Sequence, residues 1–453
     1  MRLAFFSPLN ADRSGPWVSA FSGLSDHNEE LLASLAGLVD VDVVVDGYQP
    51  ANAWIRDRFK VLNPEEFLRC RERYTAAIYH VANSYPQHSF MVPCMRKAPG
   101  IMVLHDCCLQ HLALGLTLRQ GDFRGLRRIL HETYGNNSTL LATKLLLGLG
   151  DPGSLLFARP FVEMSKGVIV YNEFARQCVL RLSPRKMVRA IPLGVPAMAE
   201  TPALEPLRRR YGFQPEHFIV ASMNSLSHTK RLNLSLEAVA ALRERFPQLR
   251  LLIVGGGSIG ADAGRMIRQF HLESVVTQPG WVSSEDYRGL LNLSDVVVDL
   301  RYPSGAETAG SLARAFAAGK PAIVSAHGSF LELPDEACIK IPVGPEEGPM
   351  LRHAIAALIE DTSARERMGA AAREFARSTL TLEGAARGCV EFVREVCAAE
   401  VAAPDGYFGE PAGSAAERFV VSGLYRLGRA GYFYRHYGMA QTLRRLREET
   451  GPE

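Results

Sequence analysis

The chain has 453 residues, of which 47% are hydrophobic and 22% are charged, and its formal net charge is only +3. This length exceeds the size at which one hydrophobic core keeps growing, so it predicts two domains. The composition is ordinary for a soluble globular protein, and so small a net charge gives no indication of nucleic-acid binding.

The N-terminal sequence MRLAFFSPLN has one charge and too short an apolar run for a signal peptide. No stretch reaches the roughly 18 apolar residues that a membrane-spanning helix needs. The eight cysteines are scattered without a CxxC pair, which suits reduced thiols better than a disulfide framework or a zinc site. We therefore expect a cytoplasmic protein.

In the first half of the chain, short apolar runs alternate with longer segments of helical periodicity. The predicted strands are Arg2 to Phe6, Val41 to Val45, Ala76 to Tyr79, Ile101 to Leu104 and Gly167 to Val170. This alternation predicts a parallel sheet. After the apolar run Ile191 to Val195, the segment Pro196 to Pro206 is rich in proline and alanine, as is typical of an interdomain linker.

A second alternating series follows this linker. Its predicted strands are Ile219 to Ser222, Leu249 to Val254, Val275 to Gln278, Val296 to Leu300, Ala322 to Ser325 and Cys338 to Ile341. The chain is therefore predicted to form two doubly wound α/β domains, whose ligands bind beyond the carboxyl ends of the strands. The tail from Tyr425 to Glu448 carries six arginines against one glutamate on a helix-like pattern.

The most informative segment follows the predicted strand Val296 to Leu300. A loop containing Glu307 leads into the helical run Ser311 to Ala318, with Thr308 or Ser311 available as a cap. Open N–H groups and the helix dipole at such a start favour a phosphate. A carboxylate would repel phosphate, so Glu307 fits neutral hydroxyls of the same ligand, which suggests a phosphate-linked sugar.

Lys230 and Arg231 lie between the predicted strand Ile219 to Ser222 and an amphipathic helix. Paired cations at such a junction can neutralise a diphosphate leaving group, and the alternative is a solvated basic pair.

A literal GxGxxG, formed by Gly255, Gly257 and Gly260, follows the strand Leu249 to Val254. The dinucleotide fingerprint also needs an acidic residue at the end of the next strand, which ends in Gln278. We therefore interpret the glycines as a turn that permits close approach of some ligand.

In the first half, Ser22 and Gly23 precede a helical run, where a glycine lets backbone N–H groups approach a phosphate or an acceptor; a simple turn is the alternative. His105 and Asp106 follow a strand directly, so their side chains should emerge at the ligand end of the sheet. For His105 the alternatives are a helix cap or a bond to a neighbour.

Asp40 and Asp42 spell the DxD that some sugar transferases use to hold a metal. Their side chains should alternate in direction along a strand, so we interpret both as surface charge and expect no metal site.

Together these segments resemble retaining glycosyltransferases of family GT4, over nearly the whole chain to about residue 395. SGLSDHNEELLASLAG resembles the SGIADYSxELLxxLA segment of bacterial polysaccharide mannosyltransferase- and rhamnosyltransferase-like proteins, and IMVLHDCCLQHL resembles their strand ending in LHD. TKRLNLSLEA resembles their KR segment. RYPSGAETAGSLARAFAAGKPAIVS resembles their RYPxxGETSGSLxRALAxGKPxIVS block. Together these matches are specific, although none is so alone.

The resemblance implies the GT-B fold, an α/β architecture of two Rossmann-like doubly wound domains facing a central cleft. Residues 1–196 would form the acceptor-binding domain and residues 197–395 the nucleotide-sugar-binding domain. Residues 396–453 would form a helical tail that packs back on the first domain or, as the alternative, lies on an anionic membrane bearing a lipid-linked acceptor.

The resemblance also implies roles for individual residues. Lys230 would bind the diphosphate, Glu307 the hydroxyls of the donor sugar, and His105 would lie near the transferred sugar. The predicted donor-binding and phosphate-binding residues complete the set: Gly23, Asn224, Arg231, Val282, Thr308, Ala309, Gly310 and Ser311.

The sequence departs from the family pattern at three places. Asn224 stands where wider GT4 members often have an arginine. Ala315 stands where they have a second glutamate that holds the ribose. The segment Ser14 to Trp17 precedes the first motif and suggests a loop that alters acceptor access.

The predicted function is transfer of a sugar from a nucleotide-diphosphate donor, with GDP-mannose or a UDP-sugar favoured, to a glycan, lipid-linked or small-molecule hydroxyl. Configuration would be retained without an enzymic nucleophile, a metal or another cofactor. The alternatives are a non-catalytic sugar-nucleotide binder or scaffold of a glycan-assembly complex, and a GT-B epimerase or phosphorylase.

Overall fold

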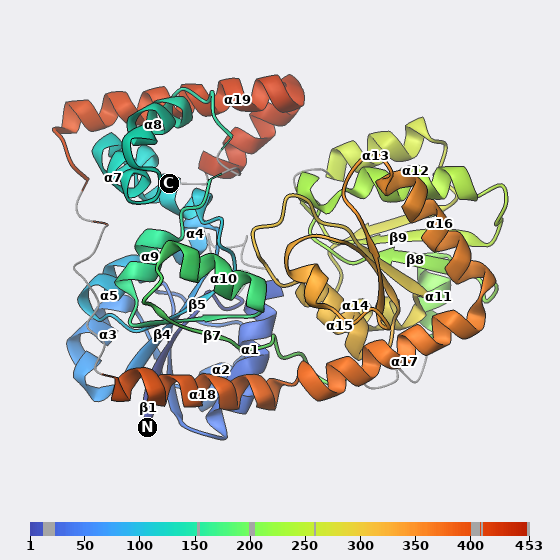
Figure 1. Cartoon of the computed structure of the whole chain (residues 1–453), viewed down its shortest axis with the longest axis horizontal. Helices are drawn as coiled ribbons and strands as arrows, with labels where there is room; N and C mark the ends of the chain where they lie inside the picture. The colour runs from blue at the N-terminus through green and yellow to red at the C-terminus, as the bar shows by residue number, and fades with distance from the viewer. Residues whose placement is uncertain are drawn as a thin grey trace. The chain divides into compact units, whose positions relative to one another are not determined.

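The computed structural model of the chain describes residues 1–11, 23–151, 155–198, 204–257, 260–399, 408 and 411–450. The chain divides into two compact units (Figure 1). The first unit comprises Met1–Ile191, Gly305–Glu307 and Ala385–Glu453, and the second comprises Pro192–Ser304 and Thr308–Gly384. Ser14 to Trp17, Ser22 and the middle of the predicted linker lie outside the described residues.

The first unit is built on a seven-stranded parallel sheet with the order β3-β2-β1-β4-β5-β6-β7. Its strands are β1 (Arg2–Phe6), β2 (Asp40–Val44), β3 (Val61–Leu62), β4 (Ala76–Val81), β5 (Ile101–Leu104), β6 (Gly167–Val170) and β7 (Met187–Ala190). Five of these were predicted. The sequence pattern did not give β3, which has two residues, or β7, which is partly exposed throughout.

Alternate side chains of these strands enter two apolar cores, one on each face of the sheet. Phe6 and Tyr79 belong to one core, and Leu3 and Phe5 to the other. Burial on both faces is the reason why the strands appear in the sequence as continuous apolar runs.

Helices flank this sheet (Figure 1). They are α1 (Gly23–Ala36), α2 (Ala53–Arg58), α3 (Pro64–Cys70), α4 (Tyr85–His88), α5 (Met91–Lys97), α6 (Gln110–Leu116), α7 (Phe123–Tyr134), α8 (Ser138–Leu146), α9 (Arg159–Met164) and α10 (Glu173–Leu182). Short 3₁₀ helices lie at η1 (Arg71–Arg73), η2 (Leu118–Gln120) and η3 (Gly135–Asn137).

The chain returns to the first unit near its end through α18 (Leu382–Ala398). Ala386, Val390 and Val393 of this helix are buried in the same core as Leu3 and Phe5. The apolar face of α18 therefore explains why Ala385–Glu453 groups with the first unit, whereas the sequence suggested a boundary at residue 395.

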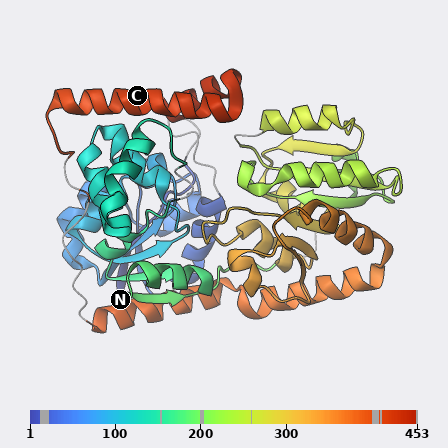
Figure 2. The ribbon, with the colours of Figure 1, turned by 45° about the horizontal axis from the view of Figure 1, so that its top comes forward.

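The long helix α19 (Ala415–Thr450) also packs on the first unit, against η2 and α8. In two views it lies alongside α7 and α8 (Figures 1 and 2). Val421 and Tyr425 pack against the core, and the Ser422 hydroxyl donates to the Arg119 carbonyl at 3.1 Å. In the described part of the chain, no helix is long and apolar enough to cross a bilayer.

The second unit contains a six-stranded parallel sheet with the order β10-β9-β8-β11-β12-β13. Its strands are β8 (Phe218–Ser222), β9 (Leu249–Val254), β10 (Val276–Gly280), β11 (Val296–Asp299), β12 (Ala322–Ser325) and β13 (Cys338–Ile341). The described helices are α11 (Glu205–Tyr211), α12 (Leu232–Leu242), α13 (Gly260–Gln269), α14 (Ser284–Leu293), α15 (Gly310–Ala317), α16 (Glu347–Glu360) and α17 (Thr362–Thr379), with 3₁₀ turns η5 (His228–Lys230) and η6 (Gly328–Glu332).

Both sheets reverse their strand order once, as doubly wound sheets do. In the second sheet the reversal lies between the neighbouring strands β8 and β11. Ligands of such sheets bind at this switch point, beyond the carboxyl ends of the strands. The loops after β8 and β11 are therefore the expected place for a site in the second unit.

Candidate functional site

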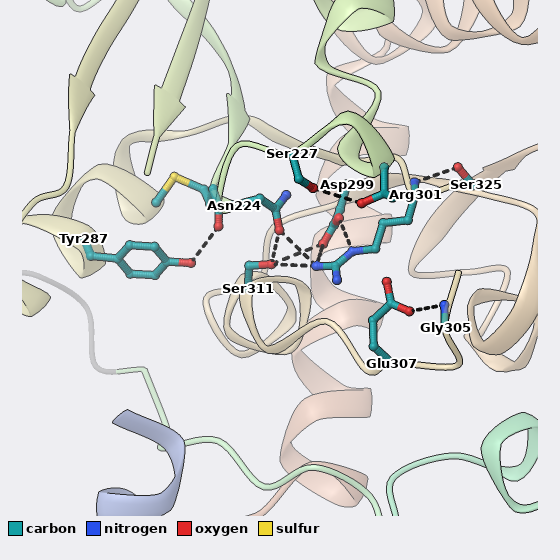
Figure 3. Close-up of polar contacts among 11 residues, drawn as sticks. Asn224, Ser227, Tyr287, Asp299, Arg301, Gly305, Glu307, Ser311 and Ser325 are labelled. Atoms are coloured by element: carbon teal, nitrogen blue, oxygen red, sulfur yellow. Dashed lines mark hydrogen bonds and ion pairs between the residues drawn. The ribbon is translucent and has the colours of Figure 1, made fainter. Parts of the chain in front are cut away.

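A buried polar cluster lies where these two loops meet (Figure 3). Asp299 at the end of β11 is fully buried, and Arg301, two residues later, is 6% exposed. The Arg301 guanidinium binds the Asp299 carboxylate with two hydrogen bonds, Nε to Oδ1 at 2.8 Å and Nη2 to Oδ2 at 3.1 Å. This bidentate geometry fixes the planar guanidinium in one orientation.

Asn224, from the loop after β8, and Ser311, in the first turn of α15, complete the cluster. The Asn224 Oδ1 accepts from Arg301 Nη2 at 3.0 Å and from the Ser311 hydroxyl at 2.7 Å. The Arg301 backbone N–H donates to Ser325 Oγ at 2.9 Å, which ties the loop to β12. The cluster thus joins both loops of the switch point to the start of α15.

Lys230 adds a further positive charge beside this cluster. Burial alone would raise the pKa of Asp299, but the charge and hydrogen bonds of Arg301, followed by the charge of Lys230, lower it below its usual value. Asp299 is therefore ionised at neutral pH, and Arg301 compensates its charge. Lys230 thus places a cation at the carboxyl ends of β8 and β11, close enough to act on Asp299, and such a cation favours an anionic ligand.

The start of α15 contributes backbone N–H groups. Its N-cap residue is Ala309, which provides no side-chain hydrogen bond. We predicted Thr308 or Ser311 as the cap, and this is wrong, because Ala309 occupies the N-cap position. The Ser311 hydroxyl lies 2.7 Å from Asn224 Oδ1 and 3.2 Å from Asp299 Oδ2. A helix start with no side-chain cap is suited to an anion.

Arg231 has a different environment from its neighbour Lys230. Its guanidinium forms an ion pair with the buried Glu347 of α16 at 2.5 Å. Its backbone has a positive φ of 49° at the junction of η5 and α12. The predicted role of Arg231 as a second cation for a diphosphate is untested, and this ion pair holds its charge near Glu347.

The glycine-rich turn after β9 approaches other protein backbone closely. A Cβ at Gly255 would lie 2.2 Å from the Asn224 carbonyl oxygen, and one at Gly257 would lie 2.3 Å from the Leu226 carbonyl oxygen. Both glycines also have positive φ, at 128° and 154°. These glycines therefore allow the turn to support the loop that carries Asn224.

The tripeptide Gly305–Glu307 groups with the first unit. The Gly305 carbonyl accepts from the Cys107 N–H at 2.8 Å, and a Cβ at Gly305 would lie 2.4 Å from Asp106 Oδ1. Glu307 Oε2 accepts from the Gly305 N–H at 2.7 Å, which holds the carboxylate against its own loop (Figure 3).

In the first unit, a cluster of histidines lies at the carboxyl ends of β4, β5 and β6. His105 follows β5, and its Nε2 lies 3.1 Å from Nδ1 of His80 in β4 and 3.4 Å from the hydroxyl of Tyr171 after β6. The same hydroxyl lies 3.5 Å from Nε2 of His27 in α1. The predicted alternative for His105, a bond to a neighbour, is thus present, and it leaves Nδ1 of the ring for another role.

Burial controls the charge of this cluster. Desolvation, with smaller contributions from the neighbouring histidines, lowers the pKa of His80 and of His105 well below the usual value. Desolvation also lowers the pKa of His88 to about 4, although its bond to the His80 carbonyl opposes this. All three imidazoles are therefore neutral at pH 7, and they act through hydrogen bonds rather than charge.

Gly23 and Val282, two further residues of the predicted site, have no side-chain hydrogen-bonding group of their own. Gly23 begins α1, and no described atom lies within 4 Å of a Cβ built there, so sterics do not demand a glycine. Val282, after β10, is half-buried and packs against the core that contains Ala315, which is itself fully buried.

The interpretation of Asp42 as surface charge is wrong. This residue is 5% exposed, pairs with Arg2 at 2.8 Å and accepts from the Tyr74 hydroxyl at 2.6 Å. A strand buried on both faces needs a partner for any charge that it carries, and Arg2 supplies it. Among the described residues, no group of three or more histidine, cysteine or acidic side chains is arranged to hold a metal ion.

The sequence analysis did not identify Asp299 and Arg301 as site residues. Their spacing was an available signal, because residues i and i+2 at the end of a strand point to the same side. Arg301 also places a guanidinium nitrogen 3.0 Å from Asn224 Oδ1, at the position where the GT4 resemblance led us to expect an arginine.

The match to a family model agrees with this location of the site. Residues 205–375, which include β8, β11 and α15, match the model of glycosyl transferases group 1. This part of the chain is therefore similar to group 1 glycosyl transferases. The resemblance to GT4 glycosyltransferases that the motifs suggested is thus confirmed.

Curated relatives match this chain over part of their length. Mannosylfructose-phosphate synthase of Agrobacterium fabrum is 29% identical over 27% of this chain and 28% of the relative. Alpha-D-kanosaminyltransferase of Streptomyces kanamyceticus is 26% identical over 42% of this chain and 48% of the relative. The chain thus matches less than half the length of either relative.

The fold has a close counterpart among solved structures. HepE from Anabaena, in complex with UDP and glucose, superposes with a TM-score of 0.63 at 16% identity, and the match covers 87% of this chain and 100% of HepE. At this identity the likeness concerns the fold alone. It confirms the predicted GT-B fold of two Rossmann-like units.

Proposed function

We propose that this glycosyltransferase transfers a sugar from a nucleoside-diphosphate sugar to a hydroxyl acceptor and retains the anomeric configuration. The observation that carries the proposal is the convergence of Lys230 and the start of α15 on the buried Asp299–Arg301 pair. A lysine ammonium group beside backbone N–H groups can stabilise a leaving diphosphate. The names of the relatives support a sugar-transfer reaction.

In this proposal Lys230 and the backbone from Thr308 to Ser311 bind the diphosphate. A supporting role falls to Arg301, Asp299 and Asn224, whose hydrogen bonds hold Ser311 and the loop after β8 in place. Ala309 and Gly310 contribute only main-chain groups.

Glu307 would bind hydroxyls of the donor sugar, and the main chain of Val282 would bind the base. Since Ala315 is buried in the core, ribose binding relies on other contacts. In the first unit, His105 would lie near the transferred sugar and Gly23 near the phosphate or the acceptor.

Retention needs no covalent intermediate if the acceptor attacks from the face that the diphosphate leaves. The departing oxygen then takes the acceptor's proton, and Lys230 stabilises the developing charge. We propose GDP-mannose or a UDP-sugar as donor and a glycan, lipid-linked or small-molecule hydroxyl as acceptor. We propose that no metal takes part, so turnover should persist in excess chelator.

Nucleotide binding provides the direct test. At a free concentration 100 times the Kd, the matching nucleotide should stabilise the protein by about 2.7 kcal/mol and raise Tm by roughly 5–10 °C. A thermal-shift screen of GDP, UDP and dTDP, and of their sugars, measures this. A Tm unchanged by every nucleotide would contradict the proposal.

Turnover of a radiolabelled donor separates the alternatives. A non-catalytic binder would show the thermal shift without sugar transfer, and a phosphorylase would release sugar phosphate only when inorganic phosphate is present. A transferase passes the label to the acceptor.

We also propose that the protein is cytoplasmic and contacts an anionic membrane through α19. All eight cysteines are free thiols. While one face of α19 packs on the first unit, another exposes apolar side chains: Phe419 is 82% exposed, Leu427 71% and Tyr434 56%. Arg426 and Arg435 are exposed beside them. Such a combination favours adsorption to anionic lipid.

Replacing Phe419 and Leu427 together by serine should weaken vesicle binding at least about tenfold, since burying each side chain contributes about 1.5–3 kcal/mol. Cosedimentation with vesicles containing phosphatidylserine measures this. Leu331, a similarly exposed residue of the second unit, gives the matched Leu331→Ser control. Equal binding of all three proteins would contradict the proposed contact, and a change of oligomeric state instead would assign the surface to self-association.

A further inference from the structure

The contact between His80 and His105 requires one ring to donate and the other to accept. His80 Nδ1 and His105 Nε2 are 3.1 Å apart, and both imidazoles are neutral at neutral pH because burial lowers their pKa values. A neutral imidazole carries one N–H and one lone pair. Either His80 donates from Nδ1, or His105 donates from Nε2. The two arrangements place the proton of His105 on opposite sides of its ring.

The surroundings of His80 favour one of these arrangements. His80 is 1% exposed, and its Nε2 has no hydrogen-bond partner among the described residues. If Nδ1 of His80 accepted, its proton would lie on Nε2 as a buried N–H without a partner. Orphaned buried N–H groups are rare and cost about 1–3 kcal/mol, and unused acceptors are tolerated more often.

The Tyr171 hydroxyl is compatible with the same arrangement. It lies 3.4 Å from His105 Nε2, and burial raises the pKa of Tyr171 well above its usual value, so that it keeps its proton. An unprotonated Nε2 of His105 has one lone pair, towards which His80 Nδ1 and the Tyr171 hydroxyl can both donate.

The environment of His80 fixes its ring. Its side chain packs on the Phe5 ring with centroids 4.5 Å apart. Its carbonyl accepts from His88, whose Nδ1 lies 3.0 Å away. His80 therefore presents Nδ1 to His105 from a strand at the centre of the sheet.

We propose that His80 is a positioning residue, which donates its Nδ1–H to His105 Nε2 and thereby keeps the proton of His105 on Nδ1. His105 then offers a neutral N–H donor at the ring nitrogen that does not face His80. The use of this donor on a hydroxyl of the transferred sugar rests on the proposed function. The tautomer itself does not.

The tautomer can be measured without any substrate. Two-bond ¹H–¹⁵N correlation spectra of the full chain, labelled with ¹⁵N-histidine, distinguish a protonated from an unprotonated ring nitrogen. The His105 signals are assigned from their loss in His105→Gln. We expect Nδ1 of His105 to be protonated and Nε2 unprotonated at pH 7.5. The reverse pattern would overturn the proposal, and this comparison needs no His80 variant to fold.

Variants then test whether His80 is the cause. His80→Leu should redistribute the His105 proton between both nitrogens, whereas His80→Asn, which keeps a donor near the position of Nδ1, should preserve the wild-type pattern. His88→Leu is the matched control, because His88 is equally buried and its Nδ1 hydrogen-bonds to the His80 carbonyl rather than to the His105 ring. An unchanged His105 pattern in folded His80→Leu would also overturn the proposal.

Measuring kcat of the His80 variants tests whether the His105 tautomer matters for the proposed sugar transfer. His80→Leu should lower kcat on the order of 10-fold, the value of one hydrogen bond, and His80→Asn should recover most of it. If the tautomer changes while kcat does not, His80 positions His105 but His105 has no part in transfer. If no sugar is transferred by the wild type, the proposed function fails and the tautomer result stands.

Discussion

Replacing Asp299 by leucine should lower the free energy of unfolding of the second unit by about 3–5 kcal/mol. The change removes the partner of the Arg301 guanidinium, which is 6% exposed and would remain charged inside the protein. Two hydrogen bonds to Arg301 and one from Ser311 would be lost with the carboxylate. Urea unfolding of wild type and variant, followed by tryptophan fluorescence, measures the difference.

Two controls isolate the buried charge. Asp299→Leu combined with Arg301→Met should regain part of the loss, because the double variant leaves no uncompensated charge. Glu374→Gln breaks an exposed ion pair with Arg377 in the same unit, and should cost at most about 1 kcal/mol. If Asp299→Leu cost no more than Glu374→Gln, the pair would not be the rigid base of the site that we describe.

The sequence predicted most of the sheet strands because they are buried on both faces. Phe218–Ser222 and Val296–Asp299 are buried at every residue and therefore appear as continuous apolar runs. The edge strand Met187–Ala190 is partly exposed throughout and includes Arg189, so its pattern does not indicate a strand. The apolar run Ile191 to Val195 was more conspicuous, yet it forms only an isolated bridge from Val195 to Thr381.

The sequence could predict the site residues whose location follows from the strand that precedes them. Lys230 and the start of α15 follow strands at the switch point, and the strand order brings them together. The partners of side chains were not predictable. Arg231 differs from Lys230 by one position, but its backbone turns it towards Glu347 of α16, more than a hundred residues away in sequence.

The neighbours of Gly255 and Gly257 were likewise not predictable from the sequence. The GxGxxG after β9 is a strong pattern, but the pattern does not say what approaches it. The structure shows that the carbonyls of Asn224 and Leu226 occupy the space beside Gly255 and Gly257. Only the three-dimensional neighbourhood distinguishes a backbone contact from a phosphate contact.

Replacing Lys230 by alanine should lower kcat on the order of 100-fold or more, the usual cost of removing one preorganised charge from a transition state. The charge of Lys230 acts on Asp299 at the end of β11, beside the start of α15. Without this ammonium group the site would lose a cation that can stabilise a departing diphosphate. The effect should fall on kcat more than on KM, because the charge on the leaving oxygen develops during transfer.

The control must keep the fold while it removes a similar side chain. Lys340 is a half-buried lysine of the second unit that pairs with Asp335, and Lys340→Ala should leave kcat unchanged. Arg231→Ala separates the two neighbouring cations: because Arg231 pairs with Glu347, its loss should reduce stability more than transfer. If Lys230→Ala turned over like wild type while Arg231→Ala did not, the diphosphate would be bound by Arg231. The Glu347 pair would then have to break when the donor binds.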